Sequence, residues 1–418
     1  MNLAGVNFVC TTVKQSMAKG IHVKTGDNDL IKKLNYGIIL DIIRESGPIS
    51  RIEISRRTGL SRSTCSAICE IMITQNLISE TGKSISSGGR KPILLELNIH
   101  AGIVIGLKLM EGEIIGAIVN LGGQVLMQKD IQIPRHLEPE IYIEDLKKFI
   151  QNLISSAQTI SGFEETGDKK VLGIGVGMSG RIDSANGILL ESSILEWKNV
   201  HIGNVLEQHF GTPVFLENDV NTFAIGEKFF GIGKPYSNYL CITVGEGIGL
   251  GIVLQGSLYR GHHHGAGEFG HIKIDFGEDS PTCSCGKKGC LEAFASDNAI
   301  VSYVEEKTGK SLSIEEVTES AEKGDTVCQE AFALAGRYLG AGISTLINLF
   351  DPEALIIGGE LAGAAHLFMD GMKAVIAENT VYELAKDINI HVLQPDTDHW
   401  VRGVATLAIK EFFSKPMV

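Results

Sequence analysis

The most informative segment of this sequence lies past its middle. It reads Gly265-Ala266-Gly267-Glu268-Phe269-Gly270-His271 and, further on, Cys283-Ser284-Cys285-Gly286-Lys287-Lys288-Gly289-Cys290-Leu291-Glu292. One histidine and three cysteines are the ligands that a closed tetrahedral zinc site takes, and the two inner glycines allow the backbone to turn sharply around an ion. The spacing therefore predicts a structural Zn²⁺ held by His271, Cys283, Cys285 and Cys290. The alternative is a loop with free or disulfide-linked thiols.

On both sides of this segment, short β-rich stretches alternate with helical ones. The first group has strands at 103–109, 113–119 and 124–131, a helix over 140–159 and a buried strand at 171–176; the second has strands at 239–244 and 249–254, a broken segment to Ile274, helices, and a strand at 354–357. Strands followed by helices, twice over, predict two α/β lobes with a cleft between them. We expect one lobe over 99–220, completed by a C-terminal helix at 400–416, and a second over 221–399.

A smaller module is expected over residues 30–98, where the charge differs from the rest of the chain. This stretch holds 10 Lys or Arg against 6 Asp or Glu, whereas residues 99–418 hold 24 against 42. A small basic module on a large acidic body indicates that only the module meets phosphate. Residues 1–29 show no clear periodicity and are interpreted as a flexible arm.

The first helix of this module is expected to begin near Leu30. The apolar residues Leu34, Ile38 and Ile42 recur every four positions, which is one stripe of an amphipathic helix. The Gly47-Pro48 pair then ends the helix.

Two further short helices complete a helix-turn-helix pattern. Ser50 to Glu53 has the spacing of a capping box, and Thr58-Gly59 can end that second helix. Ser61 can cap a third helix that runs to about Gln75. In this unit the last helix lies in the major groove of DNA.

A hairpin follows, with strands at Leu77-Ile78 and 93–97 and a Gly-Gly-Arg-Lys tip within 86–92. Such a basic tip is a good wing for a minor groove or for phosphates. The alternative is a small helical domain whose charged loop binds protein. The order of the elements favours DNA, with these expected contacts: Arg51, Ser61, Arg62, Ser63, Thr64, Arg90 and Lys91.

These motifs resemble one known family. Glu-Phe-Gly-His at 268–271 followed by Cys-x-Cys-Gly-x-x-Gly-Cys-x-Glu resembles the ROK family of repressors and sugar kinases, and the segments at 59–64 and 88–92 resemble its xylose-repressor branch. The resemblance covers roughly residues 30–410. It implies an α+β multidomain fold: a winged helix-turn-helix followed by a two-lobed α/β sugar-binding domain of the actin and hexokinase (ribonuclease H-like) type.

The resemblance also implies a sugar site. Asn218 would hold sugar hydroxyls, and Asp219 would be the counterpart of the family's general base, here vestigial. The remaining sugar contacts would be Glu268, His271 and Glu292, with His271 binding zinc through its other nitrogen. Taken alone, Asp219 reads more simply as a helix N-cap. Ser179 stands where the family has proline beside the sugar.

A working kinase of this family also needs a phosphate loop, Asp-x-Gly-Gly-Thr, at the first hairpin. The corresponding residues, 106–112, read Gly-Leu-Lys-Leu-Met-Glu-Gly and lack the Asp, both inner Gly and the Thr. A second phosphate loop at 243–249 is mostly kept, but Glu246 replaces a threonine, and the adenosine-side pair Gly358-Gly359 remains. The pattern predicts a sugar sensor without turnover. The alternatives are an ATP-dependent sugar kinase with a regulatory DNA module, and a repressor that answers to a protein such as a sugar-transport component.

Several partners and a location follow from these readings. Operator DNA and a monosaccharide effector are expected, together with a homo-oligomer, a dimer or a tetramer, because one helix-turn-helix reads only half a site. The apolar runs are too short for a membrane span, and residues 1–29 contain no continuous apolar core. We therefore expect no membrane association and a cytoplasmic protein.

Overall fold

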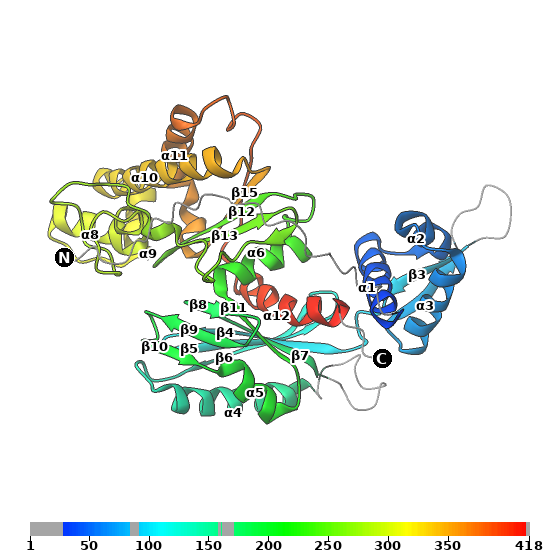
Figure 1. Ribbon diagram of the computed structural model, residues 1–418. Coiled ribbons are helices and arrows are strands. Elements are labelled where there is room, and N and C mark those ends of the chain that lie inside the picture. The colour runs from blue at the N-terminus through cyan, green and yellow to red at the C-terminus, as the bar shows by residue number, and fades with distance from the viewer. Residues whose placement is uncertain (1–27, 84–91, 158–159, 161–170, 415–418) are drawn as a thin grey trace, which may run out of the picture.

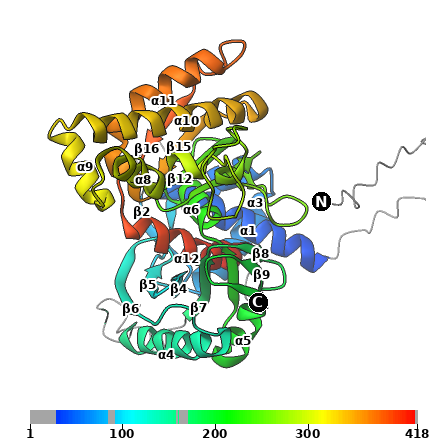
Figure 2. The ribbon, with the colours of Figure 1, turned by 90° about the vertical axis from the view of Figure 1, so that its left-hand side faces the viewer.

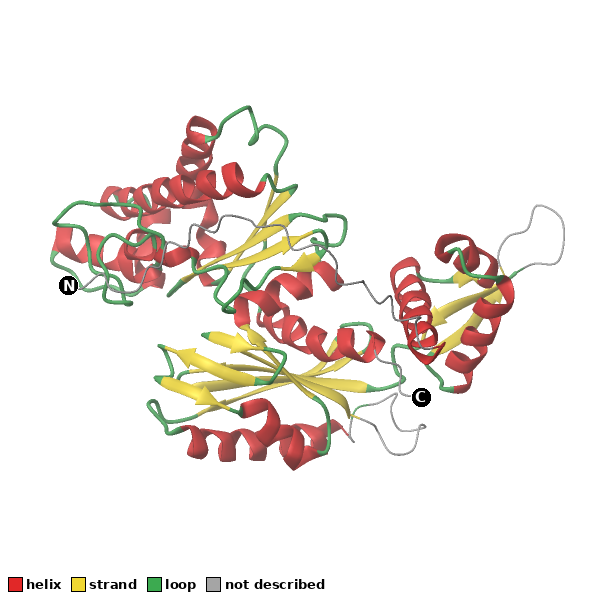
Figure 3. Cartoon of the chain, in the orientation of Figure 1, coloured by secondary structure: helices red, strands yellow, loops and turns green. Residues whose placement is uncertain are grey.

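The protein folds into a small N-terminal module beside two stacked α/β lobes (Figure 1, Figure 3). The computed structural model describes residues 28–83, 92–157, 160 and 171–414. No helix within these ranges is long and apolar enough to span a bilayer. The two-lobed architecture and the winged module both confirm the predicted fold class.

The N-terminal module has three helices and a three-stranded antiparallel sheet in the order β1-β3-β2. Its elements are α1 (Asn28–Ser46), β1 (Ile49–Ser50), α2 (Arg51–Thr58), α3 (Arg62–Thr74), β2 (Ile78–Lys83) and β3 (Ile93–Leu97). The tip of the β2–β3 hairpin, and with it Arg90 and Lys91, lies outside the described residues, as does nearly all of the predicted N-terminal arm.

The apolar stripe predicted for the first helix is not its buried face. Leu34 is 58% exposed and Ile38 is 48% exposed. The side chains that enter the core are spaced i, i+3, i+4 and i+7, the period of one helix face, and they are Tyr36, Ile39, Leu40 and Ile43. A four-residue repeat alone could not separate the two faces, because both carry isoleucine and leucine.

The helix ends in the module are largely as predicted. The Ser50 hydroxyl accepts from the Glu53 amide, Gly59 ends α2 in the left-handed conformation at φ 70°, and Ser61 caps α3. The predicted capping box is only half formed. The Glu53 carboxylate bonds Arg56 and Arg57 at 2.7–2.8 Å, because two arginines on the same helix face outcompete a backbone amide.

The first lobe is built on a five-stranded sheet in the order β11-β7-β4-β5-β6. Strands β4, β5 and β6 form an antiparallel meander, and β7 and β11 add in parallel. Its elements are β4 (Ile103–Met110), β5 (Glu113–Asn120), β6 (Val125–Gln132), α4 (Pro139–Ala157), β7 (Val171–Met178), α5 (Ile202–Phe210) and β11 (Val214–Asn218). A side sheet that the sequence analysis missed contains β8 (Arg181–Asp183), β9 (Ile188–Ser192) and β10 (Trp197–Val200).

The second lobe repeats this strand plan, with the order β14-β13-β12-β15-β16. Three antiparallel strands again come first, and two parallel strands follow. Its elements are β12 (Tyr239–Val244), β13 (Ile248–Leu254), β14 (Ser257–Leu258), η2 (Phe269–His271), α7 (Glu292–Ala295), α8 (Asp297–Thr308), α9 (Ile314–Glu322), α10 (Thr326–Phe350), β15 (Ala354–Gly358), η3 (Glu360–Ala364), α11 (Ala365–Asn379) and β16 (Asn389–Val392). The repeat inferred from the sequence pattern is present in three dimensions.

Two helices join the lobes. Helix α6 (Asp219–Phe229) packs on the second sheet, and α12 (Thr397–Ser414) packs on the first (Figure 2). They cross where Gly226 meets Gly403: a methyl group on Gly226 would lie 2.7 Å from the Gly403 Cα. Backbones this close require glycine on both sides.

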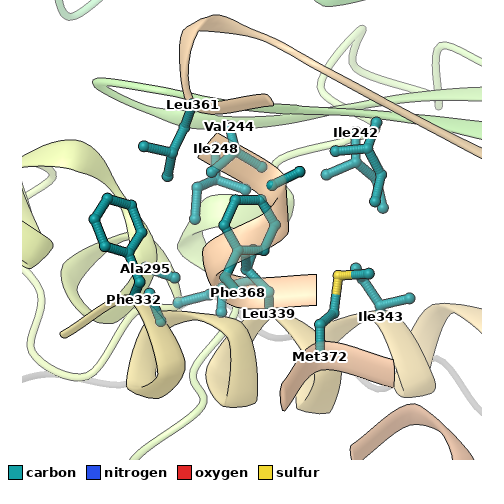
Figure 4. Close-up of a cluster of buried hydrophobic side chains, with 14 of the residues drawn as sticks. Ile242, Val244, Ile248, Ala295, Phe332, Leu339, Ile343, Leu361, Phe368 and Met372 are labelled. Carbon is teal, nitrogen blue, oxygen red and sulfur yellow. The ribbon is translucent and has the colours of Figure 1, made fainter. Parts of the chain in front are cut away.

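The outer face of each sheet carries its own core. In the second lobe the apolar side chains of β12 and β13 meet those of α10 and α11, with Phe332, Phe368 and Met372 fully buried (Figure 4). In the first lobe α4 and α5 cover the sheet, with Phe149 and Leu206 buried. Helices α12 and α6 cover the inner faces, so each of the two five-stranded sheets is covered on both faces.

Strand β7 shows how the sequence makes room for α12. Gly173, Gly175 and Gly177 alternate with larger apolar residues, and all three point at α12. A methyl group on Gly175 would overlap the carbonyl oxygen of Val404.

We expect Gly175→Ala to lower the free energy of unfolding by about 2–3 kcal/mol, because overpacking against backbone cannot be relieved by a rotamer change. Urea titration would measure it. The control is Gly363→Ala, whose methyl group would meet only the ring of Pro395 at 3.3 Å. Equal effects of the two substitutions would contradict the close packing of α12.

Candidate functional site

The four predicted metal ligands lie together in the second lobe. The ligand atoms of His271, Cys283, Cys285 and Cys290 all fall within 4.8 Å of one another. His271 Nδ1 lies 3.4 Å from the Cys283 sulfur, and the sulfurs of Cys285 and Cys290 are 3.8 Å apart. Around a tetrahedral Zn²⁺, sulfur ligands are about 3.8 Å apart and a nitrogen–sulfur pair about 3.6 Å. The donor set and its spacing therefore fit zinc.

The loop that carries the cysteines is held by its own backbone. The Cys283 amide donates to the Lys287 carbonyl at 2.8 Å, and the Gly286 amide donates back to Cys283 at 2.8 Å. Gly289 has φ 75°, and any side chain on it would overlap the carbonyl oxygen of Asp275. This position needs glycine for both reasons.

The predicted sugar residues Asn218 and Asp219 stand where β11 passes into α6. The residue that caps this helix is Asn218, not Asp219: the Asn218 oxygen accepts from the Asn221 amide at 3.2 Å, and its amide nitrogen donates to the Gly180 carbonyl at 3.2 Å. The N-cap alternative for Asp219 is therefore wrong, because Asp219 is the first helical residue and is free of the capping role.

The Asp219 carboxylate accepts a hydrogen bond from the Val220 amide at 3.0 Å. Burial raises the pKa of Asp219 above the ordinary carboxyl value, while the nearby Lys108 ammonium opposes that rise. Lys108 is itself 8% exposed and lies 3.9 Å above the ring of Trp400. A carboxyl with a raised pKa next to an amide suits a polyol, which both donates and accepts hydrogen bonds.

Glu217 precedes Asn218 in the chain and is not among the site residues predicted from the sequence. Its buried carboxylate accepts from Arg260 Nε at 2.6 Å and from the Ser184 hydroxyl at 3.0 Å, and on its other oxygen from the Asn218 amide and the Asn221 side chain at 3.0 Å each. These bonds fix the turn that presents Asn218. The one sequence signal that could have identified Glu217 is its position next to Asn218.

The remaining predicted sugar contacts lie in the segment that carries the four predicted metal ligands. Glu292 accepts from the Ser284 hydroxyl at 2.8 Å and from the Cys283 sulfur at 3.5 Å, and its other oxygen accepts from the Ile248 amide at 3.2 Å. Glu268 is exposed at the start of η2. His271 directs Nδ1 at Cys283, which leaves Nε2 on the opposite edge of its ring.

The turn between β12 and β13 separates these two groups of residues. At one end of it Ile248 bonds Glu292, and beside it Gly249 packs against Val220 of α6. The structure thus brings Asn218 and Asp219 to one side of the turn and Glu292 with the metal ligands to the other.

The segments at 106–112 and 243–249 correspond to the kinase phosphate loops expected from the sequence. Gly106 lies within β4, where a side chain would overlap the Val401 carbonyl of α12, so its role is packing. The second loop itself carries Glu246, its Gly245 carbonyl accepts from the Asp297 amide at 2.9 Å, and a methyl group on Gly245 would meet the Glu360 carboxylate. The negative charges of Glu246 and Glu360 at this position disfavour phosphate.

Asp297 is the buried member of these carboxylates. It is 8% exposed, and its Oδ1 has no hydrogen-bond partner among the residues the structure describes. Burial, together with Glu360 and Glu246, raises the pKa of Asp297 to about 7.

The predicted DNA contacts cluster at the start of α3. The Ser61 hydroxyl hydrogen-bonds to the hydroxyls of Ser63 and Thr64 at 2.8 Å each, and Arg62 is exposed beside them. Arg51 is placed differently: its guanidinium bonds Glu70 at 2.8 Å and Glu80 at 3.0 Å. It holds α2, α3 and β2 together, so the expectation that it contacts DNA loses its geometric support.

A family model described as ROK family matches residues 104–411, and one described as winged helix-turn-helix DNA-binding matches residues 38–79. The xylose repressor of Caldicellulosiruptor bescii is 31% identical over 405 residues, which is 94% of this chain and 99% of that protein.

Two solved structures extend the comparison. A ROK family transcriptional regulator described as a homolog of the E. coli MLC protein has a TM-score of 0.81 at 30% identity, covering 92% of this chain and 97% of its own. A ROK family glucokinase from Streptomyces griseus, in complex with glucose and AMPPNP, has a TM-score of 0.61 at 27% identity, covering 72% of this chain and 98% of its own.

The raised pKa of Asp297 predicts a pH dependence. The folded protein keeps this proton up to about pH 7, whereas the unfolded chain releases it near pH 4, so stability falls as the pH rises from 4 to 7. Replacing Asp297 by Asn removes this loss.

In urea titrations, the difference in the free energy of unfolding between Asp297→Asn and wild type should therefore favour the variant by about 1 kcal/mol more at pH 8 than at pH 6. The exposed Asp398, also in the first turn of a helix, provides the control, and Asp398→Asn should change stability equally at both pH values. An Asp297→Asn effect independent of pH would show that the carboxyl is ionised throughout.

Proposed function

The chain belongs to the ROK family, and from this membership we propose that it is a sugar-responsive transcriptional repressor. The winged module at about 30–98 binds operator DNA. The two lobes, about 99–220 with 400–416 and 221–399, bind a monosaccharide that releases the DNA. The observation that carries the proposal is that one chain matches both the winged helix-turn-helix model, at 38–79, and the ROK model, at 104–411.

The DNA part of the proposal is supported by the exposed start of α3. A helix N-terminus with small hydroxyls and one arginine can approach base edges and phosphates without steric obstruction. A homo-oligomer, dimer or tetramer, would supply the second half-site reader. DNA binding also fits the cytoplasmic location expected from the sequence.

The sugar part is supported by the paired amide and carboxyl of Asn218 and Asp219, with Glu268, His271 and Glu292 on the other side of the β12–β13 turn. A sugar that bridges the two sides would draw the lobes together. It releases DNA if it binds the closed, non-DNA-binding form more tightly.

The absence of kinase turnover is also part of the proposal. A base at Asp219 is not sufficient, because the donor phosphates would meet Glu246, Asp297 and Glu360. Lys108, held on the ring of Trp400, occupies the β4 segment where a kinase keeps its small residues.

To test the function, a DNA duplex that the wild-type protein selects from a random pool is fluorescently labelled, and its Kd for the protein is measured by anisotropy titration. D-xylose, D-glucose and N-acetyl-D-glucosamine are added in turn, and one of them should raise the DNA Kd at least tenfold. A coupled assay with ATP and the same sugars should show no turnover.

Two variants sharpen this test. Arg62→Ala should weaken DNA binding at least tenfold while keeping the sugar-induced rise in Tm, and Lys148→Ala on the distant α4 should change neither. If no sugar alters either DNA affinity or Tm, the sugar-sensor proposal fails. If only a protein from a cell extract releases the chain from DNA, the effector is a protein.

For the metal, we propose a structural Zn²⁺ at His271, Cys283, Cys285 and Cys290. When bound, it would fix the orientation and tautomer of His271. The purified protein should hold one zinc per chain by mass spectrometry, and Cys290→Ser should lose the metal and lower Tm. Cys328→Ser, at a buried cysteine outside the cluster, should keep the metal. Zinc retained at full occupancy in Cys290→Ser would contradict the assignment.

A further inference from the structure

We propose that Arg44 of the DNA module is the positioning residue through which sugar binding controls DNA affinity, and that helix α6 connects the two sites. This inference rests on the proposed function. It comes from the two ends of α6, one of which lies at the sugar residues and the other at α1.

At its first turn, α6 is capped by a residue of the sugar site. The Asn218 oxygen accepts from the Asn221 amide and its nitrogen donates to Gly180. A sugar hydroxyl that bonds the Asn218 side chain therefore shares the atoms that fix the start of the helix. Asp219, the first helical residue, is bound to the same turn through the Val220 amide.

At its last turn, α6 is capped from another module. Arg44 of α1 places its guanidinium 3.8 Å over the ring of Phe229 and donates from Nη1 to the Phe229 carbonyl at 3.2 Å. The Arg44 side chain is 9% exposed. The last carbonyls of a helix lack intrahelical partners and carry its negative pole, so a cation here is favourable.

Between its ends, α6 is packed too tightly to absorb a displacement. Gly226 touches Gly403, and the buried Glu227 carboxylate bonds His399 at 3.1 Å and the Ile232 amide at 2.9 Å. The helix spans about 16 Å. A shift imposed at Asn218 is therefore passed to Phe229, because a close-packed helix moves as a body.

Helix α12 reinforces the far end. The ring of Phe413 stacks on that of Phe229 at 6.5 Å and 16°, and α12 also contacts α1. Near the other end of α12, Trp400 lies under Lys108, whose charge acts on Asp219. Both inter-lobe helices thus run from the sugar residues to the DNA module.

The contact region between the N-terminal module and the end of α6, beside Arg44, leaves space for the module to rotate. A surface cavity of about 260 Å³ opens there, lined by Pro48 and Glu96 of the module side and by Phe230 and Lys234 after α6. Arg44 and its contacts with Phe229 span a joint that is otherwise only partly filled. Arg44 also bonds Asp41 and Glu45, which orient it from its own helix.

The test measures a ratio: the DNA Kd at a saturating concentration of the active sugar divided by the Kd without it. We use the full chain, the selected duplex, and whichever of D-xylose, D-glucose and N-acetyl-D-glucosamine acts on wild type. Wild type should give a ratio of at least 10. Arg44→Ala should give a ratio below 2, with a sugar Kd, measured without DNA, within threefold of wild type.

Two variants and one control distinguish coupling from folding. Phe229→Leu keeps the backbone acceptor but loses the ring, so its ratio should be intermediate. Arg44→Lys keeps a charge but loses the planar fork, so it should restore part of the ratio. Lys234→Ala removes a cation at the same cavity and should match wild type.

Each outcome decides the question. If Arg44 had only a structural role, Arg44→Ala would lower Tm and leave the ratio of DNA Kd values unchanged. A wild-type ratio in Arg44→Ala therefore overturns the inference. If Arg44→Ala does not fold, a wild-type ratio in both Phe229→Leu and Arg44→Lys overturns it instead. A ratio of 1 for wild type with every sugar overturns the proposed function itself, and the inference with it.

Discussion

The rest of the structure depends on the close packing of α12 and α6 between two sheets. Gly175 of β7 makes room for α12, Gly226 and Gly403 let the helices touch, and Gly251 of β13 faces Ala224 of α6. At each contact a glycine lets the neighbouring elements approach more closely than a side chain would allow. The two sheets, with α12 and α6 between them, therefore form one stack with little freedom to move. A domain that must report ligand binding over a distance benefits from this, because a tightly packed interior transmits displacement instead of absorbing it.

The stack also explains how one fold can be a kinase in some relatives and a sensor here. The proposed sugar residues Asn218 and Asp219 lie at the start of α6, so the packing of α6 positions them whether or not a nucleotide binds. The phosphate side depends on local residues instead: Lys108 on β4 and the carboxylates around the β12–β13 turn. Charge at those positions can change without disturbing the layers, so the proposed loss of turnover leaves the proposed sugar residues in position.

The four predicted metal ligands lie on the opposite side of the β12–β13 turn, in a segment with little regular secondary structure. Glu292 and His271 lie on a helix of four residues and a 3₁₀ helix of three, too short to be stable alone. The backbone hydrogen bonds around Cys283 hold this irregular segment in place, and the proposed Zn²⁺ would link the four side chains that converge there. The proposed sugar contacts Glu292 and His271 thus lie on irregular segments, while the proposed coupling runs through regular helices.

Much of this could be read from the sequence, because its strongest signals are local. The cysteine spacing, the caps at Ser50, Gly59 and Ser61, and the repeated strand order each depend on residues close together in the chain. Four features depended on tertiary contacts instead: the buried face of α1, the ion pairs of Arg51, the buried Glu217, and the meeting of Arg44 with Phe229. In each, a side chain is satisfied by a partner from another element, and periodicity or spacing contains no information about which element folds against it. The sequence by itself determined which elements form and which chemistry they carry; the tertiary structure alone decided which of them touch.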